Sequence, residues 1–133
     1  MSTLQLEVVT PDRKVVSEAV EMAICPGLVG EFGVLPNHVS LLSALKTGDL
    51  RYRVNGQDMH VFISGGFADM NDNILSVLAE SAELAGDIDT ARAQAAKSRA
   101  EQRLAAQDEK VDSTRAHAAL QRAITRLRIA SFN

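Results

Sequence analysis

The chain has 133 residues, of which 46% are hydrophobic and 23% are charged, a composition that is ordinary for a globular protein and excludes a largely disordered chain. Aromatic residues make up only 4% and Trp is absent, which argues against nucleic-acid modules that stack bases on aromatic side chains. The single cysteine, Cys25, excludes an internal disulfide framework, and no run of 18 apolar residues is available to cross a membrane.

The net charge of −3 hides an uneven distribution along the chain. Residues 1–84 carry 5 Lys and Arg against 11 Asp and Glu, whereas residues 85–133 carry 9 against 6. Such a division suggests two surfaces that face different partners. It fits equally well with an acidic domain that packs against its own basic C-terminal segment.

Short segments of alternating hydrophobicity fill the first 84 residues, a pattern typical of half-buried β-strands. In order, the residues expected to face a core are Leu4, Leu6, Val8, Val20, Met22, Ile24, Leu50, Tyr52, Val54, Met59, Val61 and Ile63. An apolar run covers 39–45, and the segment 74–79 closes the region. Eight to ten strands with frequent turns predict an all-β sandwich or barrel, and the lack of an intervening long helix disfavours a parallel doubly wound sheet.

Glycine and asparagine mark the turns between these strands. Asn55-Gly56 is a strong two-residue hairpin signal. The two glycines of the segment 64–67 predict a bulge or a close backbone approach. The segment 26–33 is rich in glycine, but it lacks the Gly-Lys-Ser/Thr ending of a phosphate loop and no helix follows it, so it is interpreted as an interaction loop.

Residues 85–133 predict two helices, because the segment is rich in Ala, Arg, Lys, Glu and Gln and its only glycine stands at position 86. Asp87 is expected to cap a first helix from Ile88 to about Ala106, and Asp112-Ser113 a second that runs to about Ser131. The interruption at 108–113 allows the helices to fold back as an antiparallel hairpin. The predicted class is therefore α+β, with domains at 1–84 and 85–133.

Small residues line the expected contact between the two helices, which we call the seam. The seam positions are Ala93, Ala96, Ala100 and Leu104 on the first helix and Ala116, Leu120, Ala123, Leu127 and Ala130 on the second. Alanine lets two helices approach closely, but each missing methylene forgoes about 0.8 kcal/mol of burial. The hairpin is therefore expected to be marginally stable alone and able to exchange its packing partner.

Four arginines are the strongest candidates for ligand binding, namely Arg92, Arg99, Arg122 and Arg126. The first two are seven residues apart and the last two are four apart, so each pair shares one helix face. Guanidinium groups bind phosphate through paired, planar hydrogen bonds. Asp89 and Glu83 are candidates to hydrogen-bond a base or a ribose. The alternative is a solvated helix face laced with salt bridges, which the residues alone favour.

Nothing in the chain indicates catalysis or a metal site. His38, His60 and His117 stand apart from cysteines and carboxylates at metal-ligand spacing. Cys25 has no obvious base beside it and is expected to lie in the core. No pair of carboxylates on a defined face suggests acid–base work.

Four motifs stand in order along the chain: Val8-Val9-Thr10-Pro11, Gly-Glu-Phe-Gly-Val-Leu-Pro-Asn-His at 30–38, Ser64-Gly65-Gly66-Phe67 and Ile88-Asp89-Thr90-Ala91-Arg92-Ala93. With these motifs in register over essentially its whole length, the chain strongly resembles the ε subunit of bacterial F-type ATP synthases. The resemblance implies an N-terminal antiparallel β-sandwich of about ten strands followed by a C-terminal helical hairpin, in a non-catalytic subunit of the central stalk.

In that family the sandwich binds the γ subunit and the membrane ring of c subunits. The resemblance therefore implies a peripheral place at the cytoplasmic face of the bacterial cell membrane, held through the complex, with no nucleic acid as partner. The residues that resemble the ring-facing part are Gly30, Glu31, Phe32, Gly33 and His38.

The family's hairpin is a regulator: it folds on the sandwich or extends along γ to the catalytic αβ head, where it blocks ATP hydrolysis. In some members the folded form binds ATP through an Ile/Leu-Asp-x-x-Arg-Ala motif. The matching positions, with the other carried-over contacts, are Glu83, Ile88, Asp89, Arg92, Ala93, Arg99, Arg122 and Arg126. ATP is thus expected as a regulatory ligand, with no metal held by the protein. The alternative is a free-standing adaptor that uses the basic hairpin to bind nucleic acid or protein, against which the acidic overall charge counts.

Overall fold

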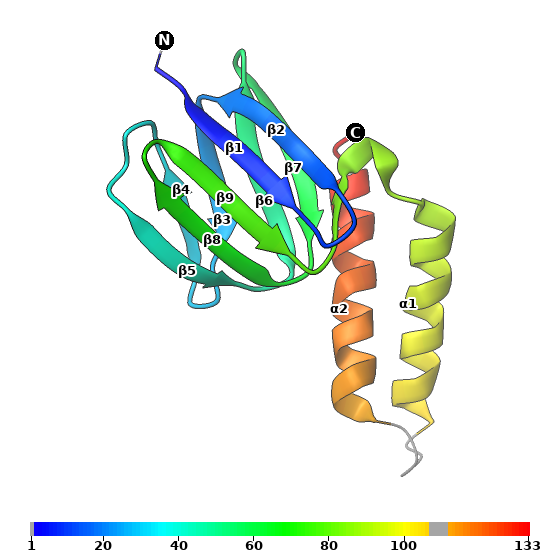
Figure 1. The fold of residues 1–133 in the computed structure, drawn as a ribbon. Helices are drawn as coiled ribbons and strands as arrows, with labels where there is room; N and C mark the ends of the chain where they lie inside the picture. Colours follow the sequence, from blue (N-terminus) through cyan, green and yellow to red (C-terminus); the bar gives the residue numbers. More distant parts are fainter. Residues whose placement is uncertain (1, 107–111) are drawn as a thin grey trace. The chain divides into compact units, whose positions relative to one another are not determined.

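The computed structural model describes residues 2–106 and 112–133. The chain divides into two compact units, Met1–Leu84 and Ala85–Asn133. The first is built of strands and the second of helices (Figure 1). Most of the interruption predicted at 108–113 lies outside the described residues.

The first unit is a sandwich of two five-stranded sheets. Sheet A has the strand order β2-β1-β9-β8-β5, and sheet B has the order β10-β7-β6-β3-β4. Sheet A consists of β1 (Leu4–Val9), β2 (Lys14–Val20), β5 (Leu41–Leu45), β8 (Gly66–Asn71) and β9 (Ile74–Ala79). Sheet B consists of β3 (Met22–Pro26), β4 (Glu31–Val34), β6 (Gly48–Val54), β7 (Gln57–Ile63) and β10 (Ala82–Leu84). The ten strands confirm the predicted sandwich.

One strand pair departs from the antiparallel prediction. β1 runs parallel to β9, with Leu6 opposite Leu75 and Val8 opposite Val77. The two strands stand at opposite ends of the domain's sequence, so no tight turn between them fixes their relative direction. All four residues are buried, which places the inward positions of both strands side by side in the core.

The predicted inward face of the third strand is wrong. The chain passes from sheet A to sheet B at Glu21, between the end of β2 and the start of β3. This passage shifts the inward positions by one residue, and such a shift moves every side chain of a strand to the other face. As a result Ala23 and Cys25 are buried, whereas Met22 and Ile24 are only half-buried. The core position expected for Cys25 is confirmed.

Two hairpins close with pairs of residues that have positive φ. Asn55 and Gly56 join β6 to β7 with φ of 52° and 78°, and Asp72 and Asn73 join β8 to β9 with φ of 51° and 62°. Two successive positive φ angles form the turn whose twist matches that of the flanking strands. The hairpin predicted at Asn55-Gly56 is confirmed.

The second unit begins with the 3-10 turn η1 (Ala85–Asp87), followed by α1 (Thr90–Ala105) and α2 (Ser113–Ala130). The helices pack side by side and antiparallel (Figure 1). The predicted seam is confirmed: four of its alanines are buried and its other five residues are half-buried. Within the described residues, neither helix is long and apolar enough to span a membrane.

Two further residues of α2, Thr125 and Ile129, are buried although the seam does not include them. The Thr125 hydroxyl donates to the carbonyl of Gln121 at 2.7 Å, so this buried polar group is satisfied within its own helix. Burial on α2 is therefore wider than a single seam.

Candidate functional site

Four apolar side chains form a line across the outer face of sheet A, which we call the apolar row. Val9 pairs with Leu78, Leu78 with Phe67, and Phe67 with Ala44, so the row crosses β1, β9, β8 and β5. Phe67 is 56% exposed and Leu78 is 59% exposed. Residues in register on adjacent strands are neighbours on the same sheet face, so the row runs without a gap across the four strands. Contiguous exposed apolar patches are typical of surfaces that bind a partner, which makes the row a candidate docking surface.

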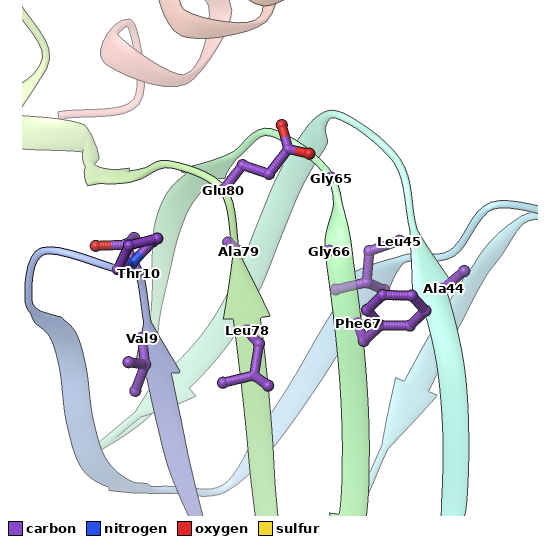
Figure 2. A pocket seen from close by; sticks show the side chains of 11 residues that line it. Val9, Thr10, Ala44, Leu45, Gly65, Gly66, Phe67, Leu78, Ala79 and Glu80 are labelled. Carbon is purple, nitrogen blue, oxygen red and sulfur yellow. The ribbon is translucent and has the colours of Figure 1, made fainter.

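The apolar row lines a groove of about 670 Å³ at one end of sheet A (Figure 2). The lining residues are Val9, Thr10, Pro11, Ala44, Leu45, Gly65, Gly66, Phe67, Leu78, Ala79 and Glu80. Glu80 is the one charged residue among them. A groove with apolar walls and a single carboxylate suits an apolar segment of another chain better than a charged small molecule.

Gly66 determines the shape of this groove. Its φ is +126°, and a Cβ at this position would overlap the carbonyl oxygen of Leu78 on the neighbouring strand. Only glycine adopts such a backbone without strain. The close backbone approach predicted for the segment 64–67 is therefore confirmed, and it brings β8 tightly against β9 beside the groove.

The predicted sites do not include the apolar row, although the sequence carries a signal for it. Leu75 and Val77 of β9 are buried in the core, while Ile74 and Leu78 on the same strand are 43% and 59% exposed. A strand with one solvated face alternates apolar and polar residues. Apolar residues at both parities therefore indicate a second face that becomes buried.

The five residues predicted to face the ring lie on β4 and on either side of it: Gly30 directly precedes the strand, and His38 lies in the loop after it. Glu31, Phe32 and Gly33 form part of β4, so the interpretation of 26–33 as one loop is wrong there. The reason is the spacing of Phe32 and Val34, which both turn toward the core and hold the segment against β3. Gly30, Glu31 and Gly33 are exposed.

The loop between β4 and β5 carries His38, which is half-buried with Nδ1 2.8 Å from the carbonyl oxygen of Val39. Exposed apolar side chains accompany these residues at both ends of β4. They are Leu28, Val29, Leu35 and Val39, with exposed fractions of 64%, 101%, 59% and 75%. We call this strip, residues 28–39, the β4 edge.

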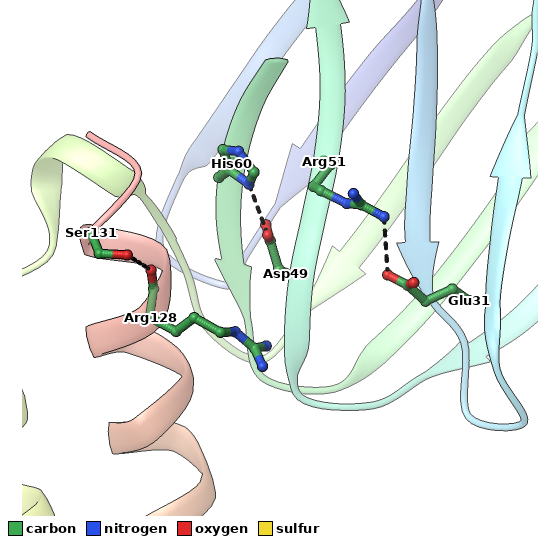
Figure 3. A network of polar contacts seen from close by, with 6 residues as sticks. All are labelled: Glu31, Asp49, Arg51, His60, Arg128 and Ser131. Atoms are coloured by element: carbon green, nitrogen blue, oxygen red, sulfur yellow. Dashed lines mark hydrogen bonds and ion pairs between the residues drawn. The ribbon is translucent and has the colours of Figure 1, made fainter.

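One ion pair and one close His–Asp contact lie on the outer face of sheet B. The Arg51 guanidinium lies 3.5 Å from the Glu31 carboxylate, and His60 Nδ1 lies 2.8 Å from Asp49 Oδ2 (Figure 3). The second pair is largely shielded from water, since its side chains are 14% and 13% exposed. The first pair connects β6 to β4 and places the Arg51 guanidinium beside the Glu31 carboxylate on the β4 edge.

The motif at 88–93 forms the start of α1. Asp89 is the N-cap, because its Oδ1 accepts the backbone N–H of Arg92 at 3.0 Å. The predicted cap at Asp87 is therefore wrong, since 85–87 form η1. Ile88 and Ala93 occupy the two positions that a hydrophobic staple joins, and both are buried. Ile88, Asp89 and Ala93 thus each have a structural role at the helix start, and Arg92 remains as the exposed cation of the motif.

The same pattern opens α2. Asp112 is its N-cap, with Oδ1 accepting the backbone N–H of Arg115 at 3.1 Å, and the following residue Ala116 is buried. Asp-x-x-Arg-Ala therefore begins both helices, and its aspartate is a cap in each. The motif by itself identifies a helix start, so an argument for a nucleotide must rest on the arginines.

The four predicted arginines each stand one residue before a seam position. Three precede buried alanines and Arg126 precedes the half-buried Leu127. One step along a helix turns the side chain by about 100°, so these residues flank the seam. In an antiparallel pair, the residues one step before the seam fall on the same side of both helices. All four arginines thus lie on one face of the hairpin, which we call the arginine face.

Charge on the arginine face is largely uncompensated. Arg92 and Arg99 are exposed, while Arg122 and Arg126 are half-buried. Within 2–106 and 112–133, no acidic side chain lies within salt-bridge distance of Arg92, Arg99 or Arg122. The alternative of a salt-bridged helix face therefore lacks its salt bridges at these three positions. Clustered cations of this kind attract anions.

The remaining candidates lie in the sandwich. Glu83 is half-buried on β10, so it belongs to the first unit, unlike the other seven positions carried over for ATP. Burial raises the pKa of the Cys25 thiol to about 12, which makes it unreactive as a nucleophile. Among the described residues, no group of three or more His, Cys, Asp or Glu is placed to hold a metal ion.

Comparison with known proteins covers both units. Residues 3–85 match the family described as ATP synthase, Delta/Epsilon chain, beta-sandwich domain, and residues 87–131 match the ATP synthase, Delta/Epsilon chain, long alpha-helix domain. The chain is 60% identical over 127 residues to the ATP synthase epsilon chain of Nitratidesulfovibrio vulgaris (strain DP4), and 50% identical over 127 residues to that of Syntrophobacter fumaroxidans. Each alignment covers 96% of this chain and 95% of the relative. A chain in the Euglena gracilis mitochondrial ATP synthase (OSCP/F1/c-ring) has a similar fold, with a TM-score of 0.81 at 24% identity over 100% of this chain and 83% of that chain.

Proposed function

Because this chain belongs to the family of ATP synthase epsilon chains and is a subunit of the central stalk, we propose that it joins the γ subunit to the membrane ring of c subunits. The apolar row and its groove bind the γ subunit, and the β4 edge faces the ring. The chain itself is non-catalytic and holds its place at the cytoplasmic face of the membrane through the ring. The observation that carries this proposal is the apolar row.

An apolar surface of this kind gains free energy only when it is covered. Burying a side chain as large as Phe67 or Leu78 contributes about 1.5–3 kcal/mol. A stable interface of standard size buries roughly 800 Å² on each partner, and its centre is apolar with a polar rim. Phe67 and Leu78 supply such a centre, and Thr10 and Glu80 supply polar groups beside it.

The β4 edge has a different character. Val29 is fully exposed and Leu28 is 64% exposed, close in sequence to Glu31, whose carboxylate lies 3.5 Å from the Arg51 guanidinium. Apolar tips with one fixed charge suit a surface that mixes apolar side chains with polar backbone groups, such as the loops at the end of a helical ring. Two unlike surfaces on one sandwich match a subunit that joins two partners.

Substitution of the apolar row tests the γ contact. Phe67→Ser and Leu78→Ser are each expected to weaken binding to the purified γ subunit roughly tenfold to hundredfold, the equivalent of one lost apolar anchor. Both residues are exposed, so the melting temperature should change little. Met59→Ser, at a 40% exposed position on β7 of the other sheet, is the matched control and should bind γ normally. Undiminished γ binding by both row variants would refute this contact.

The hairpin adds a regulatory role to this proposal. Its arginine face binds the polyphosphate of ATP while the two helices are folded together, because only then do the arginines of both helices lie on one face. ATP at a hundred times its dissociation constant would stabilise that state by about 2.7 kcal/mol. When ATP falls, the hairpin extends along γ toward the catalytic head and blocks ATP hydrolysis. The seam of small residues supports this exchange, since it buries little apolar surface.

Isothermal titration of the whole chain with ATP tests the regulatory role. Arg92→Ala and Arg126→Ala are expected to weaken binding, whereas Arg128→Ala, two residues from Arg126 and so on the other side of α2, should not. An absence of ATP binding by the wild type at millimolar concentration would refute the nucleotide role. That result would leave the γ contact of the sandwich unaffected.

A further inference from the structure

The side chain of Asn73, in the turn between β8 and β9, joins segments that are far apart in the sequence. Its Oδ1 accepts the backbone N–H of Asn37 at 2.8 Å, and its Nδ2 donates to the carbonyl of Thr3 at 2.9 Å. Its own backbone carbonyl accepts the N–H of Gln5 at 3.0 Å. One side-chain contact needs an acceptor and the other a donor, so together they fix the orientation of the amide.

The segment that Asn73 contacts is the loop 35–40, which joins the edge strands β4 and β5 of the two sheets. Asn37 has a φ of +62°, in the left-handed region that asparagine adopts more readily than most residues. Within the loop, the N–H of His38 donates to the carbonyl of Leu35 at 3.1 Å. Among the described residues, Asn73 supplies the one hydrogen bond from outside the loop to the backbone of 35–39.

We infer that Asn73 is a positioning residue that fixes the β4–β5 loop in the conformation presented to the rotor ring. The bond to Asn37 acts one residue before His38, so it fixes the backbone from which the imidazole projects. The bond to Thr3 and the backbone bond from Gln5 connect the same turn to the start of β1, so Asn73 is itself anchored to the sheet. The inference rests on the proposed role of the β4 edge in docking.

Two substitutions of Asn73 and one control distinguish the hydrogen bond to Asn37 from the hydrogen bond to Thr3. We call these two side-chain bonds the Asn73 clamp. Asn73→Gly keeps the positive φ that the turn requires and removes both side-chain bonds. Asn73→Asp keeps an acceptor for Asn37 and removes the donor to Thr3. The matched control is Asn55→Gly, because Asn55 has the same positive φ in the β6–β7 turn and its side chain bonds no other described residue.

Hydrogen exchange of the Asn37 amide, followed by NMR on the full chain, tests the clamp directly. Asn73→Gly is expected to raise the exchange rate of this amide about tenfold, the effect of losing one hydrogen bond. Asn73→Asp and Asn55→Gly should leave the rate within about twofold of wild type. An unchanged Asn37 rate in Asn73→Gly would overturn the inference.

Affinity for purified c-ring, measured with the chain bound to its γ subunit, distinguishes this inference from the proposed function. Both Asn73→Gly and His38→Ala are expected to weaken docking, and Asn55→Gly is not. If His38→Ala weakens docking and Asn73→Gly does not, the inference is overturned while the proposed docking stands. If neither weakens it, the contact of this loop with the ring is overturned too.

Discussion

Substitutions of Asp89 distinguish two possible roles of its carboxylate, as the N-cap of α1 or as a direct contact with nucleotide. Asp89→Ala removes the acceptor of the Arg92 N–H, 3.0 Å away, and is expected to cost the hairpin about 1 kcal/mol. Asp89→Asn keeps an oxygen in the same place, and asparagine caps helices about as well as aspartate. Only the interaction of the charge with the helix dipole is then lost, which is worth about 0.5 kcal/mol at an exposed site.

These magnitudes limit what a cap can do to ligand affinity. A loss of 1 kcal/mol changes the folding equilibrium of the hairpin about fivefold. If ATP binds only the folded hairpin, its apparent affinity falls by no more than that factor. Asp89→Ala should therefore bind ATP within about fivefold of wild type, and Asp89→Asn within about twofold. Asp112→Ala removes the equivalent cap of α2 and is the matched control.

Circular dichroism measures the helices in these variants, and the fluorescence of Tyr52, the only tyrosine in a chain without Trp, reports on the sandwich separately. Titration calorimetry gives the affinity for ATP. A loss of more than about tenfold in Asp89→Asn, with helix content retained, would exceed any capping effect. It would refute the capping explanation of the motif and assign the carboxylate a direct contact with the ligand.

Two further predictions concern the sandwich. Gly66→Ala is expected to lower the free energy of unfolding in urea by roughly 2–5 kcal/mol, because the φ would be strained and the new Cβ would overlap the Leu78 carbonyl. Gly33→Ala is the control and should be nearly neutral, because a Cβ there meets nothing within 4 Å. Equal effects of the two substitutions would contradict this account. Burial raises the pKa of Cys25 from 9.0 to about 12 and also raises that of Tyr52. As the pH rises, the unfolded chain loses these protons before the folded chain does. The contribution of these groups to the free energy of unfolding is therefore fully present below about pH 9 and is lost as the pH rises toward 12. Melting curves across this range should show a shallower decline in Cys25→Ala, and an identical decline would refute the assignment.

Much of the fold can be predicted from local pattern, because alternation reports directly on burial against one core. Leu4, Leu6 and Val8 alternate in the sequence and are buried in the structure. The turn at 55–56 likewise follows from two residues that tolerate positive φ. In these places the immediate neighbours of a residue determine its conformation, so no knowledge of distant segments is required.

Local pattern fails where a distant segment decides the outcome. The inward face of β3 depends on the crossing between sheets at Glu21, and the direction of β1 against β9 depends on a partner some seventy residues away. The apolar row could not be predicted for another reason. Phe67 and Leu78 have the hydrophobicity of core residues but lie outside the core. Hydrophobicity indicates that a side chain is buried somewhere, but it does not show whether its own domain or another chain covers it.

The motif at 88–93 shows how a sequence match and a physical role can differ. Ile88 and Ala93 are buried and Asp89 caps the helix, so these three have structural duties that leave Arg92 as the motif's exposed cation. The second copy of the pattern, at Asp112-x-x-Arg115-Ala116, has the same duties. Because the helices are antiparallel, Arg115 lies at the opposite end of the hairpin from Arg92 and cannot reach the same phosphate.

What distinguishes the two copies is therefore their surroundings and not the motif. Arg92 begins the helix at the end where α2 finishes, so Arg126 stands nearby on the same face, and Arg99 and Arg122 extend that face toward the loop. In the proposed ATP site, the cap at Asp89 would therefore act without touching the ligand. It fixes the backbone of Arg92 at the start of α1. This places the Arg92 side chain relative to the seam, beside which the other three arginines also lie.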